Sequence, residues 1–135
     1  MEQSRYHYNA FVTRVVDGDT IHCDIDLGFG VVLKDQVFRF YGLNAPETKG
    51  TTRQAGLDSK KFIENLLINK PIIVVSIKDK KEKFGRYLAK IYVQESNGYV
   101  DVNNLLLEKK LAVKFMDDGK NIWYNIICLN IGDYS

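Results

Sequence analysis

The side chains best suited to chemistry in this sequence are carboxylates, an amide and two arginines at the ends of short apolar segments. Asp19, in the stretch VVDGDT, and Asn44, in LNAPE, offer oxygen ligands that suit calcium or another hard divalent cation better than zinc. Glu47, which follows a proline, could polarise a water molecule. Arg39 and Arg86 could each hold a phosphate through the guanidinium fork and offset the charge of a pentacoordinate transition state.

Each of these motifs also has a purely structural interpretation. DGDT is typical of a hairpin turn closed by an aspartate side chain, NAPE is typical of a loop, and Arg39 could pair with a structural carboxylate. The motifs are not independent, because all of them fall at the ends of expected strands, which a closed barrel would bring together. Their coincidence favours one site for a phosphate ester over several unrelated structural features.

Several other kinds of site are disfavoured by the residues present. His7 and His22 are the only histidines, which is too few for a histidine-rich metal site. The sequence contains neither a glycine-rich phosphate loop nor a serine in the context of a nucleophile elbow. Cys23 and Cys128 lack the spacing of zinc ligands, and we expect both to be buried thiols.

The pattern of apolar residues predicts the elements that would position the candidate groups. Asp19 shares the parity of the inward, apolar residues of the strand that follows it, so its carboxylate needs a partner. Arg39 lies in a strand expected to be covered on both faces, and it needs a carboxylate or a bound anion. Strands are expected at residues 6–16, 20–27, 31–43, 71–77 and 86–93, and helices at 51–68 and 101–111, the second capped by Asp101.

This order of elements predicts a mainly β, α+β fold, namely a five-stranded OB-type barrel with two flanking helices. The length of 135 residues predicts one domain over residues 1–135. Hydrophobic residues make up 45% of the chain and charged residues 27%, which is typical of a globular protein. No apolar run approaches the roughly 18 residues of a membrane span, so we expect no membrane partner, and we expect a monomer.

The charge distribution permits a polyanionic partner. The net charge is only +2, but Lys78, Lys80, Lys81, Lys83 and Arg86 lie close together in the sequence. This cluster is typical either of a solvated hairpin tip or of a segment that attracts phosphates. The first residues lack the pattern of a signal peptide, which favours a cytoplasmic location, or a secreted one if a leader has been trimmed.

Four motifs in order resemble the staphylococcal nuclease (thermonuclease) family: VVDGDT, FRFYGLNAPET, KFGRYLAKIYV and NNLLLEKKLA. The resemblance is clearest over residues 12–120, and residues 121–135 form a divergent tail. It implies an OB-type barrel and a calcium-dependent endonuclease that acts on DNA, RNA or both with little sequence preference. In that family hydrolysis breaks the bond to the 5′ oxygen and leaves a 3′-phosphate end.

The resemblance also implies a role for each matching residue. Asp19 matches the calcium-binding aspartate, and Ala45 occupies the position whose backbone carbonyl completes the metal site. Arg39 and Arg86 match the two phosphate-binding arginines, and Glu47 matches the acid assigned as general base. A second group of residues matches supporting positions: Asp17 as the residue that fixes the turn, and Phe84 and Phe115 as residues beside the nucleic acid. Lys83, from the lysine cluster, is expected to add affinity for the nucleic acid.

The sequence departs from the family pattern at the metal site and beside the substrate. Asn44 stands where the staphylococcal enzyme has a second calcium-ligating aspartate, so the site loses one negative charge. Phe84 replaces a tyrosine beside the scissile nucleotide, and the stretch KFMDDGK, which includes Phe115, has no pair of tyrosines. These departures keep a second hypothesis open: a barrel without efficient catalysis that binds nucleic acid or another protein.

Overall fold

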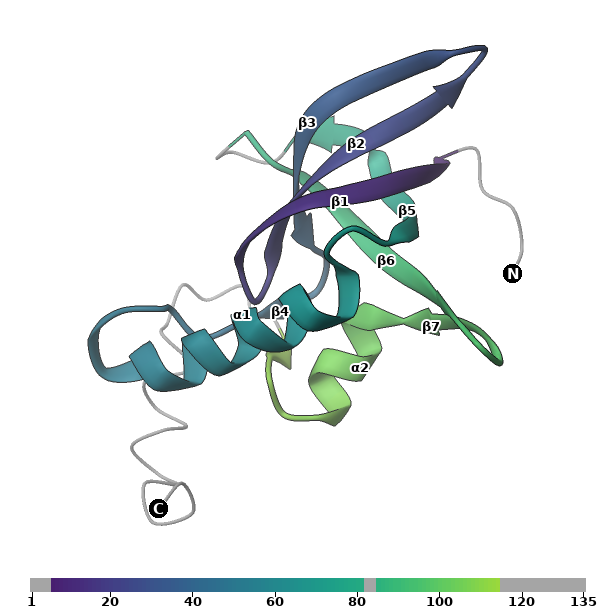
Figure 1. Ribbon diagram of the computed structural model, residues 1–135. Coiled ribbons are helices and arrows are strands. Elements are labelled where there is room, and N and C mark those ends of the chain that lie inside the picture. Colours follow the sequence, from purple (N-terminus) through teal and green to yellow (C-terminus); the bar gives the residue numbers. More distant parts are fainter. Residues whose placement is uncertain (1–5, 82–84, 115–135) are drawn as a thin grey trace.

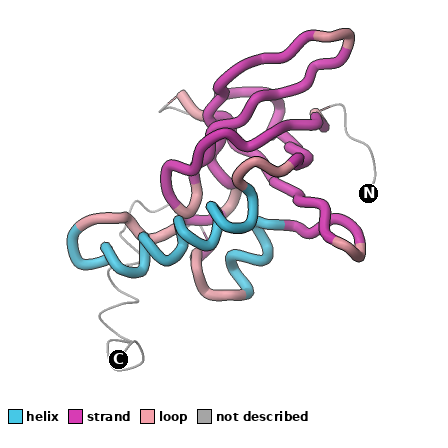
Figure 2. Tube along the Cα trace, viewed as in Figure 1, coloured by secondary structure: helices cyan, strands magenta, loops and turns pink. Residues whose placement is uncertain are grey.

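The computed structural model of the protein describes residues 6–81 and 85–114 (Figure 1). Figure 2 shows the helices gathered on one side of the strands. In chain order the elements are β1 (His7–Asp17), β2 (Thr20–Gly28), β3 (Val31–Phe40), β4 (Leu43–Asn44), a 3₁₀ turn (Gly50–Thr52), α1 (Arg53–Leu67), β5 (Pro71–Lys81), β6 (Tyr87–Glu95), β7 (Gly98–Asp101), α2 (Val102–Glu108) and β8 (Val113–Lys114).

The main sheet closes on itself to form a barrel. Its strand order is β3-β2-β1-β5-β6-β7, and β3 also pairs in parallel with β6. This pairing joins Phe38 to Tyr87 and Phe40 to Ala89. The closed barrel therefore consists of β1, β2, β3, β5 and β6, with two helices beside it, and the predicted OB-type α+β fold is confirmed.

The core follows from the alternation of side chains along the strands. In β2 the apolar residues Ile21, Cys23 and Ile25 are buried, whereas His22 and Asp24 point to the other face and are half-buried. Helix α1 adds Ile63 and Leu67 to the same apolar cluster. No helix in residues 6–81 and 85–114 is long and apolar enough to cross a membrane.

The third strand differs from its prediction. It ends at Phe40 rather than Leu43, and it is not covered on both faces along its whole length, because Val31, Val32 and Leu33 are exposed. The cause is the geometry of closure: β6 pairs only with Phe38–Phe40, so the first part of β3 belongs to a hairpin with β2 that extends beyond the barrel (Figure 1). An apolar sequence alone cannot distinguish such a projecting hairpin from a buried strand.

Other differences concern short elements and one helix end. Helix α2 has Asp101 as its N-cap, as predicted, with the carboxylate accepting a hydrogen bond from Asn104 N at 3.1 Å, but it ends at Glu108 rather than residue 111. Strands β4, β7 and β8 were not predicted, since two to four residues are too few to show a period. The predicted loop at 117–121 and the tail that follows lie outside the described residues.

Cys23 is a core thiol, as predicted, whereas Cys128 lies outside the described residues. Burial raises the pKa of the Cys23 thiol far above its usual range, so the reactive thiolate does not form at neutral pH. In a Cys128→Ser variant we expect Cys23 to react with an aromatic disulfide reagent at least ~100-fold more slowly in buffer than in denaturant. Equal rates in the two conditions would show that this part of the barrel is open.

Candidate active site

The turn between β1 and β2 carries the first candidate residues. Asp17 pairs with Thr20 across the hairpin, so the loop consists of Gly18 and Asp19 alone. The backbone N–H of Asp19 donates to the carboxylate of Asp17 at 3.1 Å, which closes the turn. Gly18 does not have a left-handed φ, so the backbone conformation does not by itself require glycine at this position.

Packing explains the glycine at position 18. A Cβ atom there would lie 2.6 Å from Cβ of Ser59 and 2.8 Å from Cβ of Ala45. The turn therefore touches both helix α1 and the segment that follows β4. Only glycine allows this three-way approach, which brings the aspartates of the turn to Asn44 and Ala45.

The two aspartates of the turn do not carry two full negative charges. Burial, and then the neighbouring carboxylate of Asp19, raise the pKa of Asp17 to about 7. Asp17 is therefore only partly ionised near neutral pH. The proton that it retains reduces repulsion from Asp19, whose own carboxylate is used for contacts across the site.

Asp19 is buried, with 8% of its surface exposed, and its carboxylate is partnered on both oxygens. Its Oδ2 accepts a hydrogen bond from the backbone N–H of Ala45 at 2.9 Å and lies 3.8 Å from Nη2 of Arg39. Its Oδ1 accepts from the hydroxyl of Thr20 at 3.0 Å. These contacts meet the requirement, deduced from the sequence, that a carboxylate on the inward face be paired.

Arg39 lies between the two residues predicted as metal ligands. Its Nη2 donates to the side-chain oxygen of Asn44 and approaches Asp19, and the guanidinium is largely shielded from solvent. The oxygens of Asp19 and Asn44 thus converge on one positively charged nitrogen. A carboxylate oxygen and an amide oxygen are donors that a hard cation accepts, so these two residue types fit calcium, although Nη2 of Arg39 takes the point between them in this structure.

The cation site, if formed here, must draw on groups other than clustered acids. Within the described part of the chain, no group of three or more histidine, cysteine, aspartate or glutamate side chains could hold a metal ion. Besides the carboxylate of Asp19, the possible donors are the amide oxygen of Asn44 and backbone carbonyls such as that of Ala45. A site with so few carboxylates is expected to bind calcium weakly.

Arg86 reaches the same site through a residue that the sequence analysis did not single out. Its Nη1 donates to the hydroxyl of Thr20 at 3.5 Å, and that hydroxyl in turn donates to Asp19. Thr20 is buried and links an arginine 66 positions away to the turn. A threonine directly after DGD was the available signal, but Thr20 shares the parity of the outward residues His22 and Asp24, and propensity alone explains a threonine in a strand.

Contacts from three elements fix the segment that carries Asn44 and Glu47. Asn44 belongs to β4, which pairs with β8 through Asn44 and Val113. The carbonyl of Glu47 accepts a hydrogen bond from the hydroxyl of Thr52 at 2.8 Å, just before α1 begins. A Cβ atom on Gly56, in α1, would lie 2.8 Å from the Pro46 carbonyl oxygen and closer still to that of Glu47. The backbone of this segment is therefore held, whereas the Glu47 side chain is exposed to solvent.

Asn103, at the start of α2, fixes the chain just before this segment. Its side chain is buried, donates to the carbonyls of Tyr41 at 3.0 Å and Ala89 at 3.2 Å, and accepts from the backbone N–H of Ile91 at 3.0 Å. One amide thus makes hydrogen bonds with three backbone groups from two different segments. It joins α2 and β6 to the turn that follows Arg39.

The structure brings together most of the residues predicted for the site. Glu47 belongs to the same segment as Asn44, and its side chain makes no hydrogen bond within residues 6–81 and 85–114 that would fix it. Lys83, Phe84 and Phe115 lie outside the described residues. The residues that meet around the β1–β2 turn are Asp17, Asp19, Arg39, Asn44, Ala45 and Arg86.

Comparisons with known proteins show which sequences this chain is similar to. The sequence model of the family described as "Staphylococcal nuclease homologue" matches residues 37–125 of the chain. The chain is also 32% identical, over 117 residues, to an uncharacterized protein of Methanocaldococcus jannaschii. The aligned region covers 76% of this chain and 56% of that relative, so the chain spans about half the length of the relative that it matches.

Proposed function

Because the chain belongs to the staphylococcal nuclease family, as its four motifs predicted, we propose that it is a calcium-dependent endonuclease. It hydrolyses phosphodiester bonds of DNA, RNA or both with little sequence preference and leaves 3′-phosphate ends. The observation that carries this proposal is the convergence of Asp19, Arg39 and Asn44 on one point, with Arg86 joined to it through Thr20. Such a grouping of cations and oxygen ligands suits a phosphate ester.

The arginines act on the phosphate. Arg39 presents a planar fork that is already oriented by Asp19 and Asn44, so little side-chain entropy is lost when a phosphate oxygen binds to it. Arg86 is oriented by Thr20 and approaches the same phosphate from the position just before β6. As water attacks and the bond to the 5′ oxygen breaks, the phosphate gains negative charge, which the two guanidinium groups stabilise.

Glu47 acts on the water. Its backbone is fixed by Thr52 and by the close approach of α1, whereas its exposed side chain can turn towards a water molecule beside the phosphate. The carboxylate accepts a proton as the water oxygen bonds to phosphorus, and the departing 5′ oxygen takes a proton from solvent. The reaction needs no base recognition, which accords with low sequence preference.

Asp19, Asn44 and the backbone carbonyl of Ala45 would hold the calcium ion. When bound, calcium supplies positive charge to a phosphate oxygen. The chain brings little negative charge to this place, because Asn44 is neutral and Asp17 is only partly ionised near neutral pH. We therefore expect activity to require calcium at a higher concentration than a site with two ligating aspartates would need.

The decisive experiment measures cleavage of single-stranded DNA and RNA as calcium is titrated, beside a sample with a chelator. We expect cleavage with calcium and none with the chelator. In Asn44→Asp we expect the half-saturating calcium concentration to fall by about tenfold or more, since a second carboxylate contributes at least ~1.4 kcal/mol to binding of the cation. Asn65→Asp, which adds the same charge at an exposed position of α1, is the matched control and should leave the concentration unchanged.

A second candidate function rests on Asn44. If the missing charge prevents calcium from binding, the same arginines would still hold nucleic acid, and the protein would be a binding module. The two functions differ in the same experiment. Wild-type protein that binds DNA in a salt-dependent way but cleaves nothing at any calcium concentration would rule out the endonuclease and favour the binding module.

A further inference from the structure

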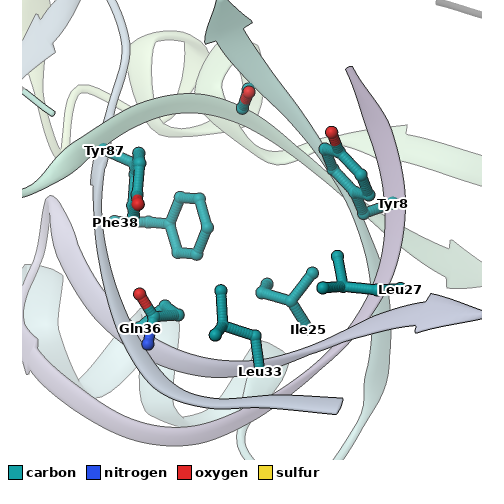
Figure 3. Close-up of a pocket in the computed structure, with 8 residues that line it drawn as sticks. Tyr8, Ile25, Leu27, Leu33, Gln36, Phe38 and Tyr87 are labelled. Carbon is teal, nitrogen blue, oxygen red and sulfur yellow. The ribbon is translucent and has the colours of Figure 1, made fainter. Parts of the chain in front are cut away.

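The barrel contains a second feature that the proposed chemistry does not use: a cavity of about 160 Å³ at one end. We call it the barrel-mouth cavity. Figure 3 shows side chains from several barrel strands pointing into a common space. Leu27 and Ser76 contribute to its wall, and the remaining lining residues are Tyr8, Ile25, Leu33, Gln36, Phe38 and Tyr87.

The lining combines flat apolar surfaces with a few polar groups. Phe38 and Tyr87 lie with their ring centroids 5.5 Å apart and their planes tilted by 33°. Tyr8 faces them across the opening (Figure 3). Gln36, whose side-chain nitrogen donates to the carbonyl of Lys34 at 2.7 Å, places an amide at the same wall, and Ser76 adds a hydroxyl. Aromatic faces with a few polar groups at the edge suit a planar ring that carries hydrogen-bonding atoms on its rim.

The volume limits the size of that ring. A cavity of roughly 150 Å³ in another protein accommodates benzene. The barrel-mouth cavity, at about 160 Å³, is therefore large enough for one six-membered ring. A fused two-ring system would extend out of it. Among nucleobases, this favours a pyrimidine over a purine.

The cavity lies next to the phosphate site, because residues of the two are neighbours in the sequence at two places. Phe38 and Tyr87 are register partners where β3 and β6 close the barrel. The residue next to each of them is an arginine of the site, Arg39 after Phe38 and Arg86 before Tyr87. Arg39 follows Phe38 within β3, so its side chain points to the other face of that strand, and Arg86 lies just before β6, next to Tyr87. A nucleic-acid strand that passes over this part of the barrel would meet both.

We propose that the barrel-mouth cavity is a subsite for a pyrimidine base of the single-stranded nucleic acid whose phosphates bind at Arg39 and Arg86. The inference rests on the proposed function for phosphate binding and adds the recognition of a base. Base binding itself needs neither calcium nor cleavage. A nuclease with this subsite cuts pyrimidine-rich single strands in preference to purine-rich ones, because the cavity is large enough for one ring but not for two fused rings.

The proposal is tested by following the methyl groups of the cavity by NMR in the presence of a chelator. Ile25, Leu27 and Leu33 supply the reporting methyl groups. We expect tetrathymidylate to shift their signals through the ring current of the bound base. A tetranucleotide of deoxyadenosine should shift them less at the same concentration. An abasic oligomer with the same number of phosphates should leave them unchanged while still shifting amide signals near Arg39.

A pair of variants on one strand measures the contribution of the cavity to affinity. Leu33 lines the cavity, whereas Val32 lies next to it on the opposite face of β3, and the two are similarly exposed, at 42% and 46%. Leu33→Trp fills the cavity and should weaken binding of tetrathymidylate by roughly tenfold. This is the loss of affinity expected when one base can no longer stack. Val32→Trp adds the same ring outside the cavity and should bind as the wild type does.

Two results would overturn the proposal. One is equal shifts of the cavity methyl groups with the abasic oligomer and with tetrathymidylate. The other is a shift of these signals with protein concentration alone, which would assign the cavity to contact with a second copy of the chain. Failure of the proposed nuclease is distinguishable from both: base-dependent shifts in a protein that never cleaves would retain the subsite and remove only the catalysis.

Discussion

Replacing Glu47 by glutamine is expected to slow the cleavage of single-stranded DNA by ~10²- to 10⁴-fold at saturating calcium, the range that loss of a general base covers. Glutamine keeps the length of the side chain but cannot accept a proton from water at neutral pH. Folding should be unaffected, with the free energy of unfolding within ~0.5 kcal/mol of wild type, because the side chain is exposed. Initial rates on a fluorescent oligonucleotide, together with urea denaturation, measure both quantities.

The matched control for this substitution is Glu95→Gln, which removes the same charge at an exposed position at the end of β6. It should cleave as fast as the wild type. Binding of the uncleaved oligonucleotide to Glu47→Gln, measured with a chelator, should also stay within a factor of about two, because the arginines that hold the phosphate are intact. A variant at position 47 that cleaves at the wild-type rate would show that another group activates the water.

Replacing Gly56 by alanine is expected to destabilise the protein by at least ~2 kcal/mol, the scale of overpacking in a closely packed region. An alanine inside a helix normally stabilises it relative to glycine by roughly 0.4 to 1 kcal/mol. Here the sign is reversed, because the added methyl group would press on the backbone carbonyls of Pro46 and Glu47. Helix α1 cannot yield easily, since Ile63 and Leu67 anchor it in the core.

Urea denaturation of Gly56→Ala measures this effect, and Asn65→Ala serves as the control. Asn65 is exposed on the same helix, so its replacement changes helix propensity without touching the site segment. It should leave stability unchanged or raise it slightly. Cleavage by the folded fraction of Gly56→Ala should also fall, because the displaced backbone carries Glu47. A gain of stability in Gly56→Ala would mean that the segment and the helix do not touch in solution.

The sequence predicted the barrel well where burial follows a simple period. The alternation of Ile21, Cys23 and Ile25 indicated the inner face of β2, and all three are buried. The prediction failed where the pairing of strands, rather than the apolar pattern, determines which residues are buried. Val31, Val32 and Leu33 are apolar and exposed because β6 joins β3 only from Phe38 onwards. Strands as short as β4 and β8 depend on each other, and no local pattern indicates them.

For the site, the sequence predicted the residues that could do chemistry better than it predicted the residues that hold them in position. A buried arginine needs a partner, and Arg39 has Asp19 and Asn44 as partners. The positioning residues were missed, because their partners are distant in the sequence. Thr20 reaches Arg86, and the hydroxyl of Ser59 donates to the carbonyl of Leu111 at 2.6 Å, 52 positions away. The sequence showed a glycine in a tight turn at position 18, but not the contacts with Ser59 and Ala45 that exclude a larger residue there.

The pairing of β4 with β8 has a consequence for synthesis of the protein. A ribosome makes Asp19 and Arg39 early, and the barrel strands follow, but Val113 and Lys114 come only after α2. Until they emerge, Asn44 lacks the strand that holds its backbone. A nascent chain that has already formed its barrel therefore carries an unfinished site, which is completed only when Val113 and Lys114 have been made.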